Sequence, residues 1–176
     1  MKPAIIIVSI AALALSVVAT PDTTAKAWGG WQGMNLSLSG SSYSITTLPD
    51  GTATSVPPFT AGQIAVARGK YGRATLRSQT FAGEFAPAAP GQCPETLPLR
   101  GVLTVSFVLT YLDGSLLSGT TTGENFYCTD GLVFDGQGAG IITGGSRRFE
   151  GAAGTWDVEA SVQNSRLTGD LHIDLD

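Results

Sequence analysis

A chain of 176 residues with a formal net charge of −4 and 14% charged residues lacks the basic surface that binding to nucleic acid or to an anionic membrane requires. Its 43% content of hydrophobic residues excludes an intrinsically disordered chain, and its length is sufficient for one domain with a hydrophobic core. We therefore expect a single folded domain that has no nucleic-acid partner.

Residues 1–27 have the order of a secretory signal peptide. Lys2 precedes a run of small and apolar residues that ends at Ala19, and a polar stretch then leads to an Ala-Lys-Ala sequence that ends at Ala27. This order is typical of a signal that is removed on export, and the apolar run is shorter than the roughly 20 residues of a spanning helix. We predict cleavage after Ala27, or alternatively after Ala19. The mature domain, residues 28–176, is then secreted or periplasmic and not inserted in a membrane; an uncleaved anchor is the remaining alternative.

The mature chain alternates apolar and polar residues with a period of two, which is typical of strands with one buried face. The apolar members of the pattern are, in chain order, Met34, Leu36 and Leu38; Leu103, Val105, Phe107, Leu109 and Tyr111; Trp156, Val158, Ala160 and Val162; and Leu167, Leu171, Ile173 and Leu175. We expect at most one or two helical turns, over residues 60–70. Residues 48–62 and 86–98 are predicted long loops because Pro, Gly and small residues are frequent there.

Many short antiparallel strands in one exported domain predict an all-β barrel or sandwich. A barrel is favoured, because a closed sheet leaves no open edge for aggregation.

The two cysteines of the chain, Cys93 and Cys128, both lie in the predicted mature domain. An even number of cysteines in an oxidising compartment favours a disulfide. A hairpin with a two-residue turn at Asp113 and Gly114 places Cys128 opposite Leu99, close to Cys93. Two cysteines this far apart lack the ligand spacing of a metal site. We predict a Cys93–Cys128 disulfide, no metal and no cofactor.

Glycines and two arginines interrupt the β-like pattern over residues 141–156. A phosphate-binding loop needs its glycines between a strand and the start of a helix, whereas the residues that follow here have the pattern of another strand. The nearest approach to a Walker motif, residues 62–72, has Ile64 in place of a glycine and Tyr71 in place of Ser or Thr. We therefore predict a corner between two strands, with Arg147 and Arg148 solvated on an exposed turn.

The same segment resembles the glycine-rich strand-turn-strand of the allene oxide cyclase barrel-like proteins, which are relatives of the plant allene oxide cyclases and the dirigent proteins. The matching residues are Ile142, Gly144, Gly145, Phe149, Gly151, Ala152 and Gly154. Arg147 stands where the family has a further glycine, and the resemblance covers roughly residues 70–176. It implies an eight-stranded antiparallel barrel with an apolar interior, often assembled as a trimer. No catalytic residue of the family is aligned with this chain.

Three polar residues are candidates for catalysis. Glu124 and Asn125 precede two aromatic residues, and a carboxyl group beside aromatic rings in a pocket has a raised pKa. Glu159 lies two residues from Asp157 at about 6.6–6.8 Å along a strand, within the range of the paired carboxylates of inverting glycosidases. Their alternation with apolar residues nevertheless predicts that these two face solvent.

The candidate ligand-binding residues are Tyr71, Arg73, Phe107, Tyr111 and Trp156. Arg73 and Tyr71 share one side of a predicted strand, which suits an anionic ligand or a polar outer face. The one histidine, His172, lies between Asp170 and Asp174, a pattern that indicates the polar face of a terminal strand more than a metal site or a general base.

These patterns favour an exported barrel that binds a small apolar or amphipathic molecule without catalysis. One alternative is a cofactor-free cyclase, isomerase or dirigent-like enzyme, which acids such as Glu124 inside the cavity would indicate. The second alternative is an envelope or extracellular interaction protein whose barrel is filled by side chains and works by its surface.

Overall fold

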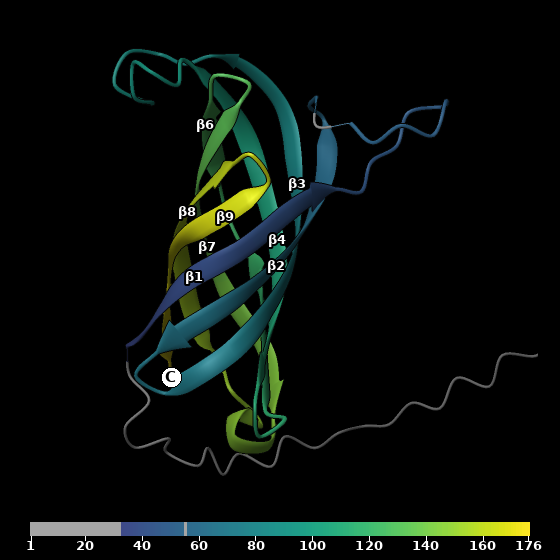
Figure 1. Ribbon diagram of the computed structural model, residues 1–176. Coiled ribbons are helices and arrows are strands. Elements are labelled where there is room, and N and C mark those ends of the chain that lie inside the picture. Colours follow the sequence, from purple (N-terminus) through teal and green to yellow (C-terminus); the bar gives the residue numbers. More distant parts are fainter. Residues whose placement is uncertain (1–32, 55) are drawn as a thin grey trace, which may run out of the picture.

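The computed structural model describes residues 33–54 and 56–176 (Figure 1). The predicted signal peptide and both of its cleavage sites lie outside the described residues. Within the described part of the chain, no helix is long and apolar enough to cross a membrane.

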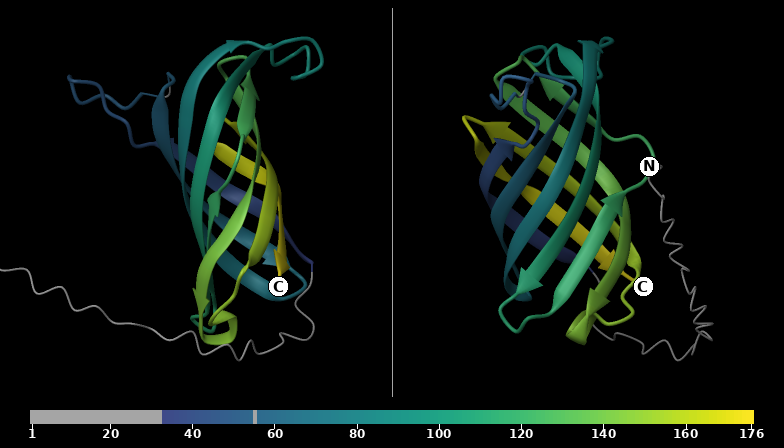
Figure 2. Two further views of the ribbon diagram at one scale, coloured as in Figure 1. Left: turned by 180° about the vertical axis from the view of Figure 1, so that it is seen from behind. Right: turned by 90° about the vertical axis from the view of Figure 1, so that its right-hand side faces the viewer.

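Nine antiparallel strands form one closed sheet (Figures 1 and 2). They are β1 (Met34–Ser44), β2 (Phe59–Gly69), β3 (Gly72–Pro87), β4 (Leu99–Tyr111), β5 (Leu116–Thr121), β6 (Phe126–Thr129), β7 (Val133–Ser146), β8 (Gly154–Gln163) and β9 (Arg166–Leu175). The order is β3-β2-β1-β9-β8-β7-β5-β4, and pairing of β3 with β4 closes the sheet. Because β6 continues the position of β5 between β4 and β7, the barrel has eight strand positions. The predicted all-β, eight-stranded antiparallel barrel is confirmed.

The period-two pattern corresponds to the inside and the outside of the barrel. The four apolar series expected from the sequence face inward, and their members are buried or half-buried. Residues 60–70 form most of β2 and contain no helical turn, because pairing with β1 on one side and β3 on the other overrides the helix propensity of the alanines. The loops are shorter than expected, since Phe59–Gly62 belongs to β2 and Ala86–Pro87 to β3.

The two ends of the barrel differ. One end holds the β4–β5 turn and the short 3-10 helix η1 (Arg147–Phe149) (Figure 1). Large buried side chains fill this end. Leu109, Leu117 and Ile173 are fully buried there, and the rings of Tyr111 and Phe149 lie 5.2 Å apart. The other end carries loops 45–58 and 88–98 (Figure 1). We call them the closed end and the open end.

The glycine-rich segment forms the predicted corner, in which η1 joins β7 to β8. The prediction of two solvated arginines is wrong for Arg148, whose guanidinium lies 4.2 Å above the ring of Tyr111 and 4.9 Å from that of Phe149. Arg148 also forms an ion pair of 3.4 Å with Asp113, while the guanidinium of Arg147 donates a hydrogen bond to the carbonyl of Asp113. The arginines therefore tie the corner to the β4–β5 turn across the closed end.

The β4–β5 turn spans three residues, 112–114, and not the two expected from the sequence. The backbone N–H of Tyr111 donates to the carbonyl of Ser115 (2.9 Å), and Gly114 adopts a positive φ of 76°, a combination typical of three-residue hairpin loops. A hydrogen bond from the Ser115 N–H to the Asp113 carboxylate (2.9 Å) orders the turn and lowers the pKa of that carboxyl. With this turn Thr110 pairs with Leu116, and β6 then pairs with β4 in a register that is shifted by two residues relative to that of β5. The two differences together place Cys128 opposite Arg100 and not opposite Leu99.

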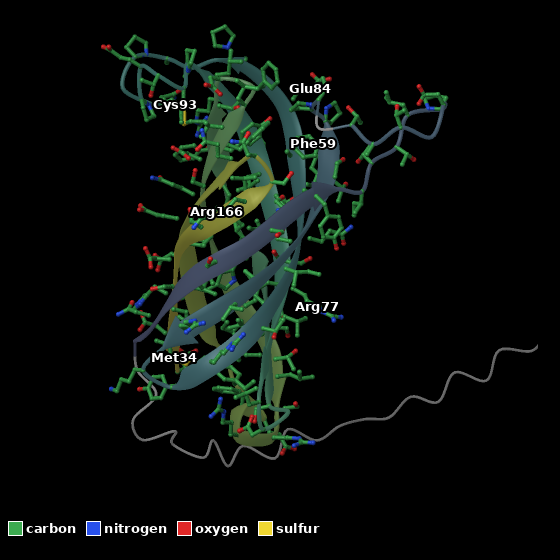
Figure 3. All side chains as sticks on the ribbon, in the orientation of Figure 1. Met34, Phe59, Arg77, Glu84, Cys93 and Arg166 are labelled. Carbon is green, nitrogen blue, oxygen red and sulfur yellow. A yellow bond between two sulfur atoms is a disulfide. The ribbon has the colours of Figure 1, made fainter. Side chains whose placement is uncertain are left out.

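The predicted disulfide is confirmed. Cys93, in the β3–β4 loop, is bonded to Cys128 of β6, with 5.8 Å between the Cα atoms (Figure 3 labels Cys93). It attaches the loop at the open end to the side of the barrel.

We expect the double variant Cys93→Ser/Cys128→Ser to lose about 4 kcal/mol of unfolding free energy, because the disulfide closes a long loop and restricts the unfolded chain. Urea denaturation with and without a reductant measures the difference. The variant also serves as the control for the reductant, because the chain has only these two cysteines. Reductant should lower the free energy of unfolding of the native protein and leave that of the variant unchanged. Equal denaturation midpoints would contradict the expectation.

Candidate ligand-binding cavity

The open half of the barrel contains a cavity of about 440 Å³. All strands except β5 contribute to its lining, together with parts of loop 45–58 and the β8–β9 turn. Side chains of Figure 3 mark its position: Phe59 at the open end lines the cavity, Met34 belongs to the filled closed end, and Arg77 projects outward from β3.

Two aromatic rings form the floor of the cavity. Phe107 of β4 and Trp156 of β8 meet edge to face, with centroids 5.2 Å apart and an interplanar angle of 84°. The indole Nε1–H of Trp156 donates to the carbonyls of Thr120 (3.2 Å) and Ile141 (3.0 Å). A Cβ atom on Gly119 would lie 2.7 Å from the Phe107 ring and 2.8 Å from Nε1 of Trp156. The absence of a side chain at Gly119 therefore makes room for the floor, whose polar N–H group is already satisfied.

One wall of the cavity is apolar. Val158, Ala160 and Val162 project inward from β8, and Leu167 and Leu171 continue the surface on β9. The three β8 side chains are only half-buried, in contrast to the fully packed residues of the closed end. This wall can accept hydrocarbon from a ligand.

The wall made by β1, β2 and β3 carries neutral polar groups. Gln63 is 7% exposed, and its Oε1 accepts hydrogen bonds from the hydroxyls of Ser78 (2.8 Å) and Thr80 (3.0 Å). Ser42, which is 8% exposed, lies opposite Gln63 on the neighbouring strand. We call Ser42, Gln63, Ser78 and Thr80 the polar wall; all four line the cavity.

Aromatic side chains surround the cavity above the floor. The ring of Phe134 lies 5.9 Å from that of Phe59 and 5.9 Å from that of Tyr127. The hydroxyl of Tyr127 donates to the carbonyl of Gly83 (2.6 Å), and burial raises the pKa of the phenol to about 12. Tyr127 is therefore neutral at physiological pH, and its one donor is already used.

None of the described residues that line the cavity is Asp, Glu, Lys, Arg or His. Among the residues that the structure describes there is also no group of three or more His, Cys, Asp and Glu side chains placed to hold a metal ion. The described lining is thus apolar or neutral throughout.

The ligand-binding candidates from the sequence lie in three different places. Phe107 and Trp156 form the floor of the cavity. Tyr111 is buried in the closed end beneath Arg148. Tyr71 lies at the β2–β3 turn beside Lys70, and Arg73 is on the outer face of β3.

None of the candidate catalytic residues lines the cavity. Glu124 is exposed in the β5–β6 connection, and Glu159 is on the outer face of β8, 3.4 Å from Nε2 of Gln137. Asn125 is buried, but its Oδ1 accepts from the backbone N–H of Ala139 (2.5 Å) and its Nδ2 donates to the carbonyl of Thr122 (3.2 Å). Asn125 therefore orders the break between β5 and β6.

His172 has polar neighbours on the outer face of the barrel. Its Nδ1 lies 2.5 Å from Oδ1 of Asn35, and its Nε2 lies 3.2 Å from the carboxylate of Asp174. This arrangement agrees with the polar face that was expected for the terminal strand.

Sequence reasoning missed the polar wall. The signal was present: Gln63 is in phase with the inward Ala61, Ala65 and Ala67, and Ser78 and Thr80 are in phase with buried residues of β3. A polar residue in the apolar phase of a strand indicates an inward polar group. Because helical turns were expected over residues 60–70, the period-two alternation that includes Gln63 was not recognised.

Comparisons of the chain with protein-family models, with curated proteins and with solved structures found no match.

We expect the free energy of unfolding to fall as the pH rises from about 10, the pKa of a tyrosine in an unfolded chain, through the native pKa of Tyr127 near 12. The native state retains a proton in this interval that the unfolded chain has lost, so alkali favours unfolding. Tyr127→Phe should remove one tyrosine's share of the tyrosinate absorbance change near pH 12. It should also lower the free energy of unfolding by about 0.5–1.5 kcal/mol, because the carbonyl of the half-buried Gly83 loses its donor. The exposed Tyr43→Phe is the control. Because burial also raises the pKa of Tyr111, the readout is the amplitude, and an unchanged amplitude near pH 12 in Tyr127→Phe would contradict the assignment.

Proposed function

We propose that the protein binds a small apolar or amphipathic molecule in the barrel cavity and does not change it chemically. The observation that carries this proposal is the cavity of about 440 Å³, open at one end and with a neutral, mostly apolar lining. Its volume is within the range of about 300–1,000 Å³ that is usual for small-molecule sites.

The hydrophobic effect is sufficient to drive such binding. A ligand that buries about 200 Å² of apolar surface against the floor and the β8 wall gains roughly 5 kcal/mol before the entropic cost of association. The floor is held in place by edge-to-face packing and by the satisfied indole of Trp156. Little of the gain is therefore spent on ordering the site.

The alternatives receive less support. Acid–base catalysis needs a titratable group within hydrogen-bond reach of the reacting atoms, and the candidate acids Glu124 and Glu159 lie outside the cavity. A barrel that works only by its surface has no use for an open interior lined by half-buried aliphatic side chains. Cyclase, isomerase or dirigent-like chemistry and a purely structural role are therefore the less favoured proposals.

Export is part of the proposal. Disulfides persist in oxidising compartments, and the Cys93–Cys128 bond agrees with the predicted signal peptide of residues 1–27. We propose a secreted or periplasmic protein that holds its ligand away from water.

The test is a titration with N-phenyl-1-naphthylamine, a neutral apolar fluorophore whose emission rises in an apolar site. We expect saturable binding to the native protein and at least tenfold weaker binding to Ala160→Phe, because the added ring fills the cavity from the β8 wall. The matched control is Ala139→Phe, the same substitution at an exposed position on β7, which should bind within about twofold of the native protein. Native mass spectrometry of the bound species gives the stoichiometry.

No saturable binding to the native protein, or equal affinity of Ala160→Phe and Ala139→Phe, would contradict the proposed function.

A further inference from the structure

Gln63 is a polar side chain in the apolar phase of β2. It is 7% exposed, its neighbours in the inward phase are Ala61 and Ala65, and all three are buried inside the barrel. Removing an amide from water without hydrogen-bond partners destabilises a protein. A buried glutamine among alanines therefore needs a compensating set of partners.

Only one end of this amide has partners within the described chain. The hydroxyls of Ser78 and Thr80 both donate to Oε1, at 2.8 and 3.0 Å, which fixes the orientation of the amide plane. No acceptor for Nε2 is found among the described residues. Because Gln63 lines the cavity, its two N–H donors are available to an acceptor that enters there.

The surroundings of Gln63 determine which acceptor fits. A carboxylate would be buried without a cation, since the described lining has none, and burial of an unpaired charge is strongly unfavourable. A carbonyl oxygen accepts from an amide N–H without bringing a charge into the cavity. Ser42, opposite Gln63 on β1, adds a hydroxyl beside the same position.

The position of Gln63 also orients the ligand. Ser78 is the register partner of both Gln63 on β2 and Phe107 on β4, so the polar wall borders the floor of the cavity. The remaining space above the floor is lined by the aliphatic side chains of β8 and by the aromatic group of Phe59, Tyr127 and Phe134.

The geometry points to a specificity of the cavity: Gln63 recognises the carbonyl oxygen of a neutral ligand, such as a ketone, ester or amide, whose hydrocarbon part extends from the floor toward the open end. This inference rests on the proposed binding function and names the chemical class of the ligand. Gln63 donates from Nε2, and Ser78 and Thr80 position its amide.

The test compares two neutral naphthalene fluorophores, one with a carbonyl group and one without. 6-Propionyl-2-dimethylaminonaphthalene (Prodan) carries a ketone, and its emission moves to longer wavelength when that ketone accepts a hydrogen bond; N-phenyl-1-naphthylamine has no carbonyl. We expect Gln63→Met to weaken Prodan binding roughly five- to tenfold and to shift its bound emission to shorter wavelength. Binding of N-phenyl-1-naphthylamine should be unchanged or stronger.

A second variant separates the loss of the amide from a loss of stability. Gln63→Met leaves the hydroxyls of Ser78 and Thr80 without their acceptor. The triple variant Gln63→Met/Ser78→Ala/Thr80→Val replaces the amide and both hydroxyls by apolar groups of similar shape, a change that is nearly neutral for stability. The triple variant should retain N-phenyl-1-naphthylamine binding and show the same loss and the same emission shift for Prodan.

The charge of the ligand is tested by displacement of N-phenyl-1-naphthylamine. We expect 2-dodecanone to displace the fluorophore from the native protein at least tenfold more effectively than dodecanoate at pH 8, at concentrations below micelle formation. Equal or better displacement by dodecanoate would overturn the inference.

The two proposals fail in different ways. If neither fluorophore binds the native protein, both the binding function and the carbonyl specificity are wrong. If both fluorophores bind and Gln63→Met changes neither affinity nor emission, or changes both fluorophores equally, the function stands and the role of Gln63 is wrong.

Discussion

Pairing of β3 with β4 closes the sheet, and the rest of the structure depends on this closure. In a closed sheet every strand has hydrogen-bonding partners on both sides, and every second residue must point into a confined interior. An eight-stranded barrel is just wide enough for side chains to fill it or for one small ligand to be enclosed. The sizes of the inward residues therefore decide whether the interior is solid or hollow.

The sizes of the inward side chains differ between the two ends of the barrel. Leucine, isoleucine, methionine and aromatic side chains fill the closed end, where Arg148 and Asp113 join the corner to the turn. Above the Phe107–Trp156 floor the inward residues include Ala61, Ala82 and Ala160, which are too small to meet across the interior. The cavity is thus a consequence of side-chain volume within a regular sheet.

The strands and the disulfide were predictable from the sequence because each depends on short-range information. Alternation with a period of two reveals which residues share a face, and an even number of cysteines in an exported chain indicates a bridge. The register was less predictable. The positive φ of Gly114 allows a three-residue turn, and Asn125 orders the break between β5 and β6. As a result, Cys128 lies opposite a residue of β4 that is one position away from the predicted one. The polar wall was not found at all, since Gln63, Ser78 and Thr80 come together only through pairing of β2 with β3. The side of the barrel on which Glu124 or Tyr71 lies likewise depends on strand ends and turns, which local patterns define poorly.

The filled closed end gives the barrel the form of a cup and not of a tube. A molecule that enters past Phe59 and Tyr127 meets the ring pair of Phe107 and Trp156 and must leave by the way it came. Under the proposed function, loading and release use the same opening and the same desolvation step, so at a given affinity slow loading implies long retention. Under the proposed function, a partner that takes a ligand from this protein would approach the rim made by loop 45–58 and the β8–β9 turn. Because described residues fill the opposite end, transfer in either direction would pass this rim.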